Sequence, residues 1–268
     1  SQKGRDKLIL VTSPAISSFG LWVEQLIAES TGKEGLGIIP VAGEPMLSPK
    51  HYGDDRLFVY LRLEGDDNAE NDEAINEIEV SGQPVVRLEL RDIYDVGAEF
   101  FRWEMAAAVA GSILGINPFD QPNVQVAKDM TESVLDQFES SGKLPAMEDA
   151  ASICKLLEMA VPGDYLVIMA YVLQTPEVDL ALDALRRRVT ERYGIATTMG
   201  YGPRFLHSTG QLHKGGPKSG LFLQITAEHT QDLDIPGAQF TFGVLADSQA
   251  LGDLQALRAS GRQSVRVD

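Results

Sequence analysis

The sequence predicts an α/β protein with a doubly wound, mostly parallel sheet, followed by a smaller α/β lobe. Two observations predict this class. Short apolar runs of strand length alternate with longer segments of helical periodicity. A polar stretch, ESSGKLPAMEDA (139–150), then separates two strongly periodic regions. We therefore expect one domain over residues 1–140 and a C-terminal lobe over residues 150–268.

The first region begins with a strand-turn-helix unit. KLILVTS (7–13) predicts a short buried strand, and the apolar residues of SSFGLWVEQLIAES (17–30) form one helical stripe. Further strands are predicted at 35–43, 56–64 and 84–91, with an acidic, helix-like segment before the last of them and a long helix at 96–115.

The second region repeats the alternation but leaves its strand order open. DYLVIMAYV (164–172) predicts a strand, and 177–194 predicts an amphipathic helix that ends at Gly194. The remaining elements are strands near 196–201, 220–226 and 239–246, a helix near 248–260 and a last strand, SVRVD.

Composition limits the classes of partner. The 39 acidic and 23 basic residues give a formal net charge of −16, which disfavours nucleic acid and anionic membranes as partners. A local basic site can still bind a small phosphorylated substrate. There is no apolar run of the roughly 20 residues that a membrane span needs. The single cysteine, Cys154, and the absence of a secretory signal in the first ten residues predict a cytoplasmic protein, with Cys154 in the core.

Common cofactor and metal motifs do not fit this sequence. STGKE (30–34) departs from the phosphate-loop pattern, and GYGPRF (200–205) lacks the full glycine fingerprint of a nicotinamide site. The four histidines form no HExxH motif, and one cysteine cannot form a CxxC pair. We therefore predict no cofactor and no metal site.

Glu29 is the first candidate catalytic residue. It lies in the last turn of the first predicted helix, where the negative end of the helix dipole should raise its pKa. A raised pKa suits a general base that works near neutral pH. The alternative is an ordinary solvent-facing glutamate at a helix end.

Two further segments carry unusual polar residues. In NPFDQPNVQVAKDMTE (117–132), Gln121 and Lys128 would lie within about 20° of one helix face and roughly 10 Å apart if both were helical; alternatively, Lys128 pairs with Glu132 on the surface. The glycine-rich segment 201–220 contains two histidines that could transfer protons near neutral pH, or it is simply a mobile basic loop.

These segments resemble a known family. FGLWVEQLIAESTGKEGLGIIPV (19–41) and GINPFDQPNVQVAK (115–128) resemble the second sugar-isomerase (SIS) domain of phosphoglucose isomerase. YGPRFLHSTGQLHKGGPKSGLFLQIT (201–226) resembles the C-terminal signature of the bacterial version fused behind a transaldolase. The resemblance implies a flavodoxin-like SIS fold and interconversion of glucose 6-phosphate and fructose 6-phosphate in glycolysis and gluconeogenesis, through ring opening and a cis-enediol.

The resemblance also implies residue roles. Glu29 is the base that moves a proton between C2 and C1, while Gln121 and Lys128 contact the substrate and the lysine takes part in ring opening. The family's ring-opening histidine lies in a Thr-x-Gly-Gln-His motif between the glutamate and the lysine. Here the nearest match, residues 208–213, follows the lysine, so we favour His213 over His207. The substrate-binding residues implied are Gln121, Lys128, Thr31, His207 and Gln211.

The family's first SIS domain supplies the phosphate-binding loop and an arginine, and neither motif precedes residue 7. We therefore expect a C-terminal part of the enzyme that is incomplete and inactive alone. Its expected partners are a sugar phosphate, a missing N-terminal SIS domain, with a transaldolase domain as a possible further one, and a second copy in a homodimer. The alternative is a non-catalytic sugar-phosphate-binding or assembly module with the same fold.

Overall fold

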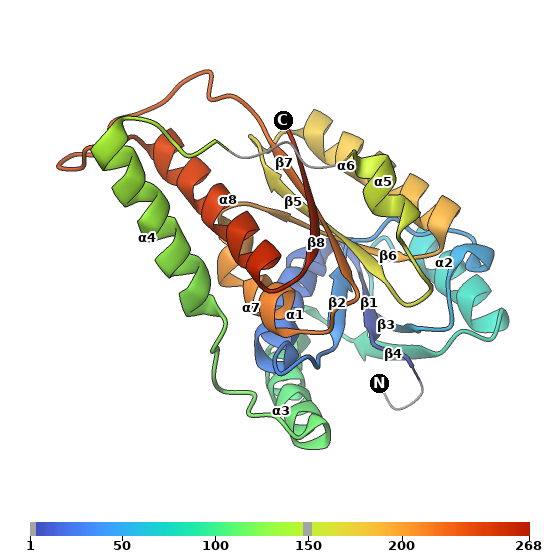
Figure 1. Ribbon diagram of the computed structural model, residues 1–268. Coiled ribbons are helices and arrows are strands. Elements are labelled where there is room, and N and C mark those ends of the chain that lie inside the picture. The colour runs from blue at the N-terminus through green and yellow to red at the C-terminus, as the bar shows by residue number, and fades with distance from the viewer. Residues whose placement is uncertain (1–3, 147–151) are drawn as a thin grey trace.

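The computed structural model describes residues 4–146 and 152–268, and shows two four-stranded sheets surrounded by helices (Figure 1). The strand orders are β2-β1-β3-β4 and β6-β5-β7-β8, and every pair of neighbouring strands is parallel. This confirms the α/β class and the parallel sheet. The second sheet has as many strands as the first, so the second lobe is not the smaller one by sheet size. The strands are β1 (Lys7–Thr12), β2 (Ile39–Ala42), β3 (Arg56–Leu63), β4 (Val85–Leu90), β5 (Tyr165–Tyr171), β6 (Ala196–Tyr201), β7 (Gly220–Thr226) and β8 (Gln263–Val267).

The helices confirm most of the predicted periodic segments. Helix α3 ends at Gly115 and α6 at Gly194, each with a positive φ that glycine adopts without strain. The α-helices are α1 (Ser17–Thr31), α2 (Ala69–Val80), α3 (Val96–Leu114), α4 (Val124–Ser141), α5 (Ile153–Glu158), α6 (Pro176–Tyr193), α7 (Gly210–Gly215) and α8 (Phe242–Ala259). The short 3-10 helices are η1 (Pro14–Ile16), η2 (Pro49–His51), η3 (Ile93–Asp95) and η4 (Arg204–His207).

Each sheet is covered on both faces. Helices α1 and α3 pack on one face of the first sheet through Val23, Ile27 and Trp103, and α2 packs on the other through Ile75 and Ile78. Helices α5 and α6 cover the outer face of the second sheet. Because consecutive crossovers fall on opposite faces, both sheets are doubly wound.

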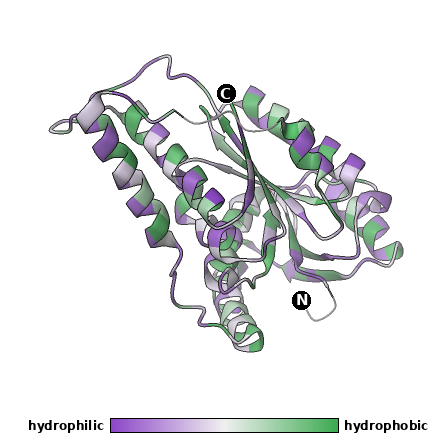
Figure 2. Cartoon of the chain, viewed as in Figure 1, coloured by the Kyte–Doolittle hydropathy of each residue, from purple (hydrophilic) through white to green (hydrophobic). Residues whose placement is uncertain are grey.

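One hydrophobic core is shared by both halves. It joins side chains of the first sheet, such as Phe58 and Tyr60, to Val167, Met169 and the α8 residue Leu257 of the second half. Figure 2 shows hydrophobic residues along the central strands and more hydrophilic residues on the outer helices. Burial of this shared apolar surface stabilises the two halves against each other.

A buried polar cluster joins the edge strands β2 and β6. Arg186 of α6 is 2% exposed and donates to the carbonyl oxygens of Ala42 (3.1 Å), Gly43 (2.6 Å) and Thr197 (3.0 Å). Glu44 accepts from the backbone N–H of Thr197 at 2.7 Å. The guanidinium therefore donates to backbone carbonyls of both halves.

Helix α4 extends from the first half onto the second. It packs along α8, as Figure 1 shows, and a Cβ added to Gly252 would lie 2.6 Å from the Thr131 hydroxyl. The glycine thus permits close contact between the two helices. The domain boundary predicted within 139–150 lies partly outside the described residues, and the division into two domains stays a prediction.

Two predictions about local structure were wrong. The strand predicted near 239–246 is largely replaced by α8, because the Thr241 side chain accepts from the Val244 N–H and so begins a helix. Cys154 is exposed on the short helix α5 rather than buried in the core. The first error concerns the type of element, and the second concerns which face of a helix the rest of the chain covers.

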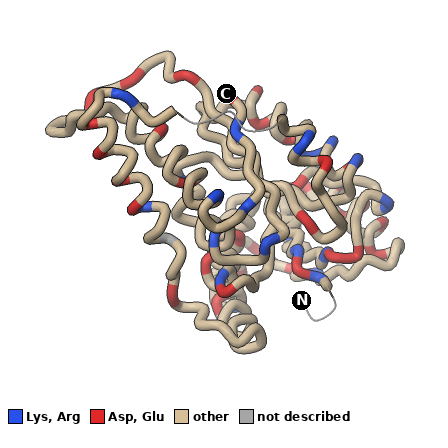
Figure 3. The backbone as a smooth tube through the Cα atoms, viewed as in Figure 1, with Lys and Arg blue, Asp and Glu red and all other residues tan. Residues whose placement is uncertain are grey.

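Asp and Glu residues are spread over the outer helices and loops (Figure 3). Within residues 4–146 and 152–268, none of the helices combines the length and the apolar character required to cross a membrane.

Candidate active site

The three segments singled out in the sequence meet at the end of α1. Gln211 of α7 is buried and its amide donates to the Gly32 carbonyl and to Asn123 Oδ1, both at 2.8 Å. The Asn123 N–H in turn donates to Gln211 Oε1 at 2.9 Å. One glutamine side chain therefore fixes the α1 terminus, α7 and the start of α4 in relation to one another.

Close packing at this junction explains the glycine of the AESTGK segment. A Cβ at Gly32 would lie 2.4 Å from Leu212 Cα, which is backbone and cannot yield as a side chain could. A Cβ at Gly215 would lie 2.3 Å from Asn123 Oδ1. The Gly35 N–H also donates to the Gly215 carbonyl at 2.9 Å. Glycine at positions 32 and 215 lets α7 lie directly against the end of α1.

Glu29 is half-buried in the last turn of α1. Gln121 Nε2 donates to its Oε2 at 3.3 Å. Burial raises the pKa of Glu29, while a hydrogen bond from Gln25 and the charge of Lys33 act in the opposite direction. The direction agrees with the sequence prediction, but the principal cause is desolvation rather than the helix dipole.

The loop that presents Gln121 is held by a buried lysine. Lys33 is 1% exposed, and its Nζ donates to the Asn117 carbonyl at 2.8 Å and contacts Asp120 Oδ1 at 3.0 Å. The Lys33 ammonium lowers the pKa of the Asp120 carboxyl. Lys33, the last residue of AESTGK, therefore holds the loop 117–120 in place.

A pocket of about 200 Å³ opens beside this junction, between α4, α7, α8 and η4. Lys128 lines it from α4 and His207 from η4, and both side chains are exposed. Lys214 also lines it, paired with the buried Asp253 at 2.6 Å. The Glu132 carboxylate lies in the same lining, so the pocket combines two ammonium groups, one of them already paired, with an imidazole and a carboxylate.

Gln25 connects this pocket to Glu29. Its Nε2 donates to the His207 carbonyl at 3.1 Å, and its side chain hydrogen-bonds Glu29, which lies one turn further along α1. The carboxylate and the pocket residue are thus linked through one side chain.

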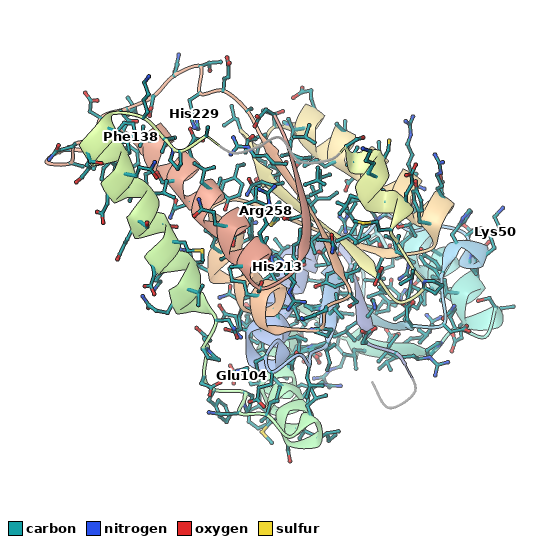
Figure 4. The ribbon with its side chains drawn as sticks, viewed as in Figure 1. Lys50, Glu104, Phe138, His213, His229 and Arg258 are labelled. Atoms are coloured by element: carbon teal, nitrogen blue, oxygen red, sulfur yellow. The ribbon has the colours of Figure 1, made fainter. Side chains whose placement is uncertain are left out.

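His213 lies in the core of the protein. It is 3% exposed, and its ring packs between Phe205 (centroids 5.8 Å apart) and Phe222 (5.3 Å). Burial lowers its pKa well below the usual value, so the ring stays neutral. Figure 4 shows it within the body of the molecule, beside α7 and α8. His207 lines the pocket and His213 does not, and which histidine opens the sugar ring stays a prediction.

Gln121 and Lys128 do not share a helix face. Helix α4 begins at Val124, so Gln121 belongs to the preceding turn, where it meets Glu29. Among the described residues, Lys128 forms no ion pair with Glu132, although both line the pocket. The structure brings Glu29 together with Gln121, and Lys128 with His207.

Thr31 and Gln211 have internal partners. Thr31 is fully buried; its hydroxyl donates to the Ile27 carbonyl at 2.7 Å and accepts from the Ile38 N–H at 3.0 Å. Gln211 is 1% exposed. Neither side chain faces a pocket in the described structure, so both support the site rather than form its surface.

Sequence reasoning missed Gln25, Lys33 and Lys214 as contributors. Helical spacing places Gln25 one turn before Glu29, which could have revealed it. The contacts of Lys33 and Lys214 depend on segments distant in sequence, and nothing local predicted them. Among the described residues, no group of three or more His, Cys, Asp or Glu side chains is placed to hold a metal ion.

The fold and the site define an α/β protein in which a half-buried carboxylate is linked through Gln25 to a pocket lined by Lys128, His207 and Lys214. The chain is similar to a probable glucose-6-phosphate isomerase of Methanococcus maripaludis, with 30% identity over 165 residues, 49% of this chain and 38% of that protein. It is also similar to the glucose-6-phosphate isomerase of Enterococcus faecalis, with 25% identity over 193 residues, 56% of this chain and 40% of that protein.

The predicted resemblance is therefore confirmed over about half of the chain, which spans about two fifths of the length of these relatives. No model of a known protein family matches the chain. Among solved structures, the C-terminal domain of glucosamine-fructose-6-phosphate aminotransferase from Francisella tularensis aligns with 98% of this chain and 72% of that chain at 12% identity. Its TM-score of 0.30 is too low to establish a shared fold.

Proposed function

We propose that this chain carries the proton-transfer part of an isomerase that interconverts glucose 6-phosphate and fructose 6-phosphate. The observation that carries the proposal is that Gln25 hydrogen-bonds both Glu29 and the main-chain carbonyl of His207, whose side chain lines a pocket together with Lys128. Similarity to glucose-6-phosphate isomerases supports the same reaction.

Glu29 is the base in this proposal. Its carboxylate takes the proton from C2 of the open-chain aldose, which leaves a cis-enediol, and returns the proton to C1 to give the ketose. The hydroxyl hydrogens rearrange between O1 and O2, and no external oxidant or reductant is needed. The raised pKa of Glu29 makes its carboxylate a stronger base, so the transfer of a proton from C2 to Glu29 is less unfavourable.

His207 and Lys128 open the sugar ring in this proposal. Protonation of the ring oxygen and removal of the anomeric hydroxyl proton release the aldehyde. The side chains of His207 and Lys128 are both exposed in one pocket. Lys128 also contacts the substrate in this proposal.

In this proposal, the phosphate-binding site of the complete enzyme lies on a further SIS domain, as the family resemblance implies. Active sites form preferentially between domains. A homodimer and a cytoplasmic location remain part of the same hypothesis.

The first test is Glu29→Gln in the complete protein, assayed by coupling fructose 6-phosphate conversion to oxidation of glucose 6-phosphate. We expect kcat to fall by roughly 10²-fold to 10⁴-fold with KM nearly unchanged, because the amide keeps the shape but cannot accept the proton. The exposed Glu34→Gln is the matched control. Near-normal kcat in Glu29→Gln would remove that residue from the role.

The histidines are separated by a second pair of variants. We expect His207→Gln to lower kcat by about 10²-fold or more, and His213→Phe, which fills the same aromatic cluster, to keep most activity. The reverse outcome would return the ring-opening role to His213. Tight binding of a sugar phosphate by calorimetry, with no turnover in the complete protein, would support the non-catalytic binding module instead.

A further inference from the structure

The second sheet has an open crevice at its topological switch point. From β5 the chain crosses to β6 on one side, and β7 and β8 lie on the other side. In open parallel sheets, ligands bind outside the carboxyl ends of the strands at such a point. A pocket of about 430 Å³ lies there, between the ends of β5 and β7 and the first turns of α8. This volume is within the usual range for small-molecule sites.

The equivalent place in the first sheet is closed by its own side chains. There, Ser13 follows β1 and its hydroxyl accepts from the Leu63 N–H at 2.7 Å and contacts Asn68 Oδ1. Asn68 Nδ2 donates to the Leu63 carbonyl at 2.7 Å, and both polar side chains are buried. The same strand order thus gives a filled crevice in one half and an empty one in the other.

The open crevice contains a histidine-carboxylate pair. His229 Nε2 lies 3.1 Å from Asp247 Oδ1, and both side chains are about one third exposed. Figure 4 places His229 at the upper edge of the molecule, away from His213. Glu228 and Gln231 also line the pocket, so carboxylate and amide groups surround the imidazole.

The crevice is not built for a phosphate. Among the described residues that line it, none is Lys or Arg. The beginning of α8, which could otherwise attract an anion, is already occupied: Asp232 accepts from the Gly243 N–H at 2.7 Å, and Thr241 accepts from the Val244 N–H. An added anion would face these carboxylates without a compensating cation.

We propose that this crevice binds a small, unphosphorylated polyol. Hydroxyl groups are hydrogen-bond donors that match the carboxylates of Asp247 and Glu228, and they can exchange donor and acceptor roles with His229. Val172, Ala227 and Ala246 supply apolar contacts for a carbon skeleton. The site is separate from the pocket of Lys128 and His207, and the inference does not depend on the isomerase proposal.

The test is a titration of the whole chain with D-glucitol, followed through the side-chain NMR signals of its four histidines. We expect the His229 signals to move with a dissociation constant on the order of 1 mM, as small neutral ligands commonly bind, while the His213 signals stay fixed. We expect the dissociation constant for glucitol 6-phosphate, measured from the same His229 signals, to be at least tenfold higher.

Ala246→Leu fills the crevice with a residue that favours helix, and should weaken glucitol binding at least tenfold. Ala259→Leu, exposed at the other end of α8, is the matched control and should leave binding unchanged. The proposal is overturned if the His229 signals do not move, if Ala246→Leu binds glucitol as well as the parent chain, or if the phosphate ester binds more tightly than glucitol.

Discussion

The two halves of the molecule share one strand order but differ in what their loops supply. In each half, the last turn of the helix that follows the first strand contains a glutamate, Glu29 in α1 and Glu191 in α6, and a glycine caps the helix three residues on, at Gly32 and Gly194. Each helix end also receives a loop from the other half.

The reciprocal contacts are similar in kind. Gln25 of α1 donates to the His207 carbonyl of the second half, and His51 Nδ1 of the first half lies 3.2 Å from the Glu191 carbonyl of α6. Near α1, helices α4, α7 and α8 surround a pocket with Lys128 and Lys214, whereas the pocket at the end of α6 is lined by Lys50 and His51 together with Asp54, Asp55 and Glu191. In both halves the sheet positions a helix end, and the connecting loops determine the chemistry found there.

The largest change in stability is expected when the polar link between the two halves is broken. Arg186→Met removes a buried guanidinium that donates to three carbonyl oxygens and faces Glu24 and Glu44. Since buried acceptors and carboxylates would lose their partner, we expect a loss of about 3–5 kcal/mol in the free energy of unfolding. Urea denaturation measures it.

The exposed Arg188→Met on the same helix is the control and should change stability by less than about 0.5 kcal/mol. A single cooperative transition at lower urea would confirm that the halves unfold together. Two separate transitions would show instead that each sheet is an independent unit.

Glu24 makes this interface sensitive to pH. Burial raises its pKa to about 7, although Arg186 and a hydrogen bond with the Ala42 backbone act in the opposite direction. The folded protein therefore binds this proton more tightly than the unfolded chain, whose glutamate pKa is near 4.5. The stabilisation from this group is complete below the unfolded pKa and is lost as pH rises to about 7.

We expect this one group to contribute roughly 3 kcal/mol of the difference in unfolding free energy between the two ends of that range. Glu24→Gln, which does not titrate, should flatten the pH dependence by a similar amount. Urea unfolding near pH 5 and near pH 8 compares the two proteins. An unchanged slope in Glu24→Gln would assign the effect to other groups.

A smaller loss of stability is expected from a substitution at the end of α1. Gly32→Ala places a Cβ against the Leu212 backbone and should cost about 1–3 kcal/mol while displacing α7 from α1. Gly97→Ala in the first turn of α3 meets no atom within 4 Å and should be neutral or slightly stabilising. Thermal unfolding of both variants measures the difference; equal behaviour would show that α7 is loosely held.

Much of the fold could be predicted from the sequence because the signals are local. The apolar stripe of α1, the short buried strands and the glycine ends of α3 and α6 follow from periodicity and from left-handed backbone that glycine tolerates. The AESTGK segment and Lys128 could also be singled out locally, although not their contacts.

What the tertiary structure decided was which side chains are covered and by what. Residues 204–213 contain two histidines of similar local character, yet the fold buries His213 between aromatic rings and leaves His207 exposed in a pocket. Likewise, both sheets have one strand order, but only packing closed one switch point with Ser13 and Asn68 and left the other open. Local sequence fixes backbone preference over a few residues, whereas burial depends on surfaces that come together from distant parts of the chain.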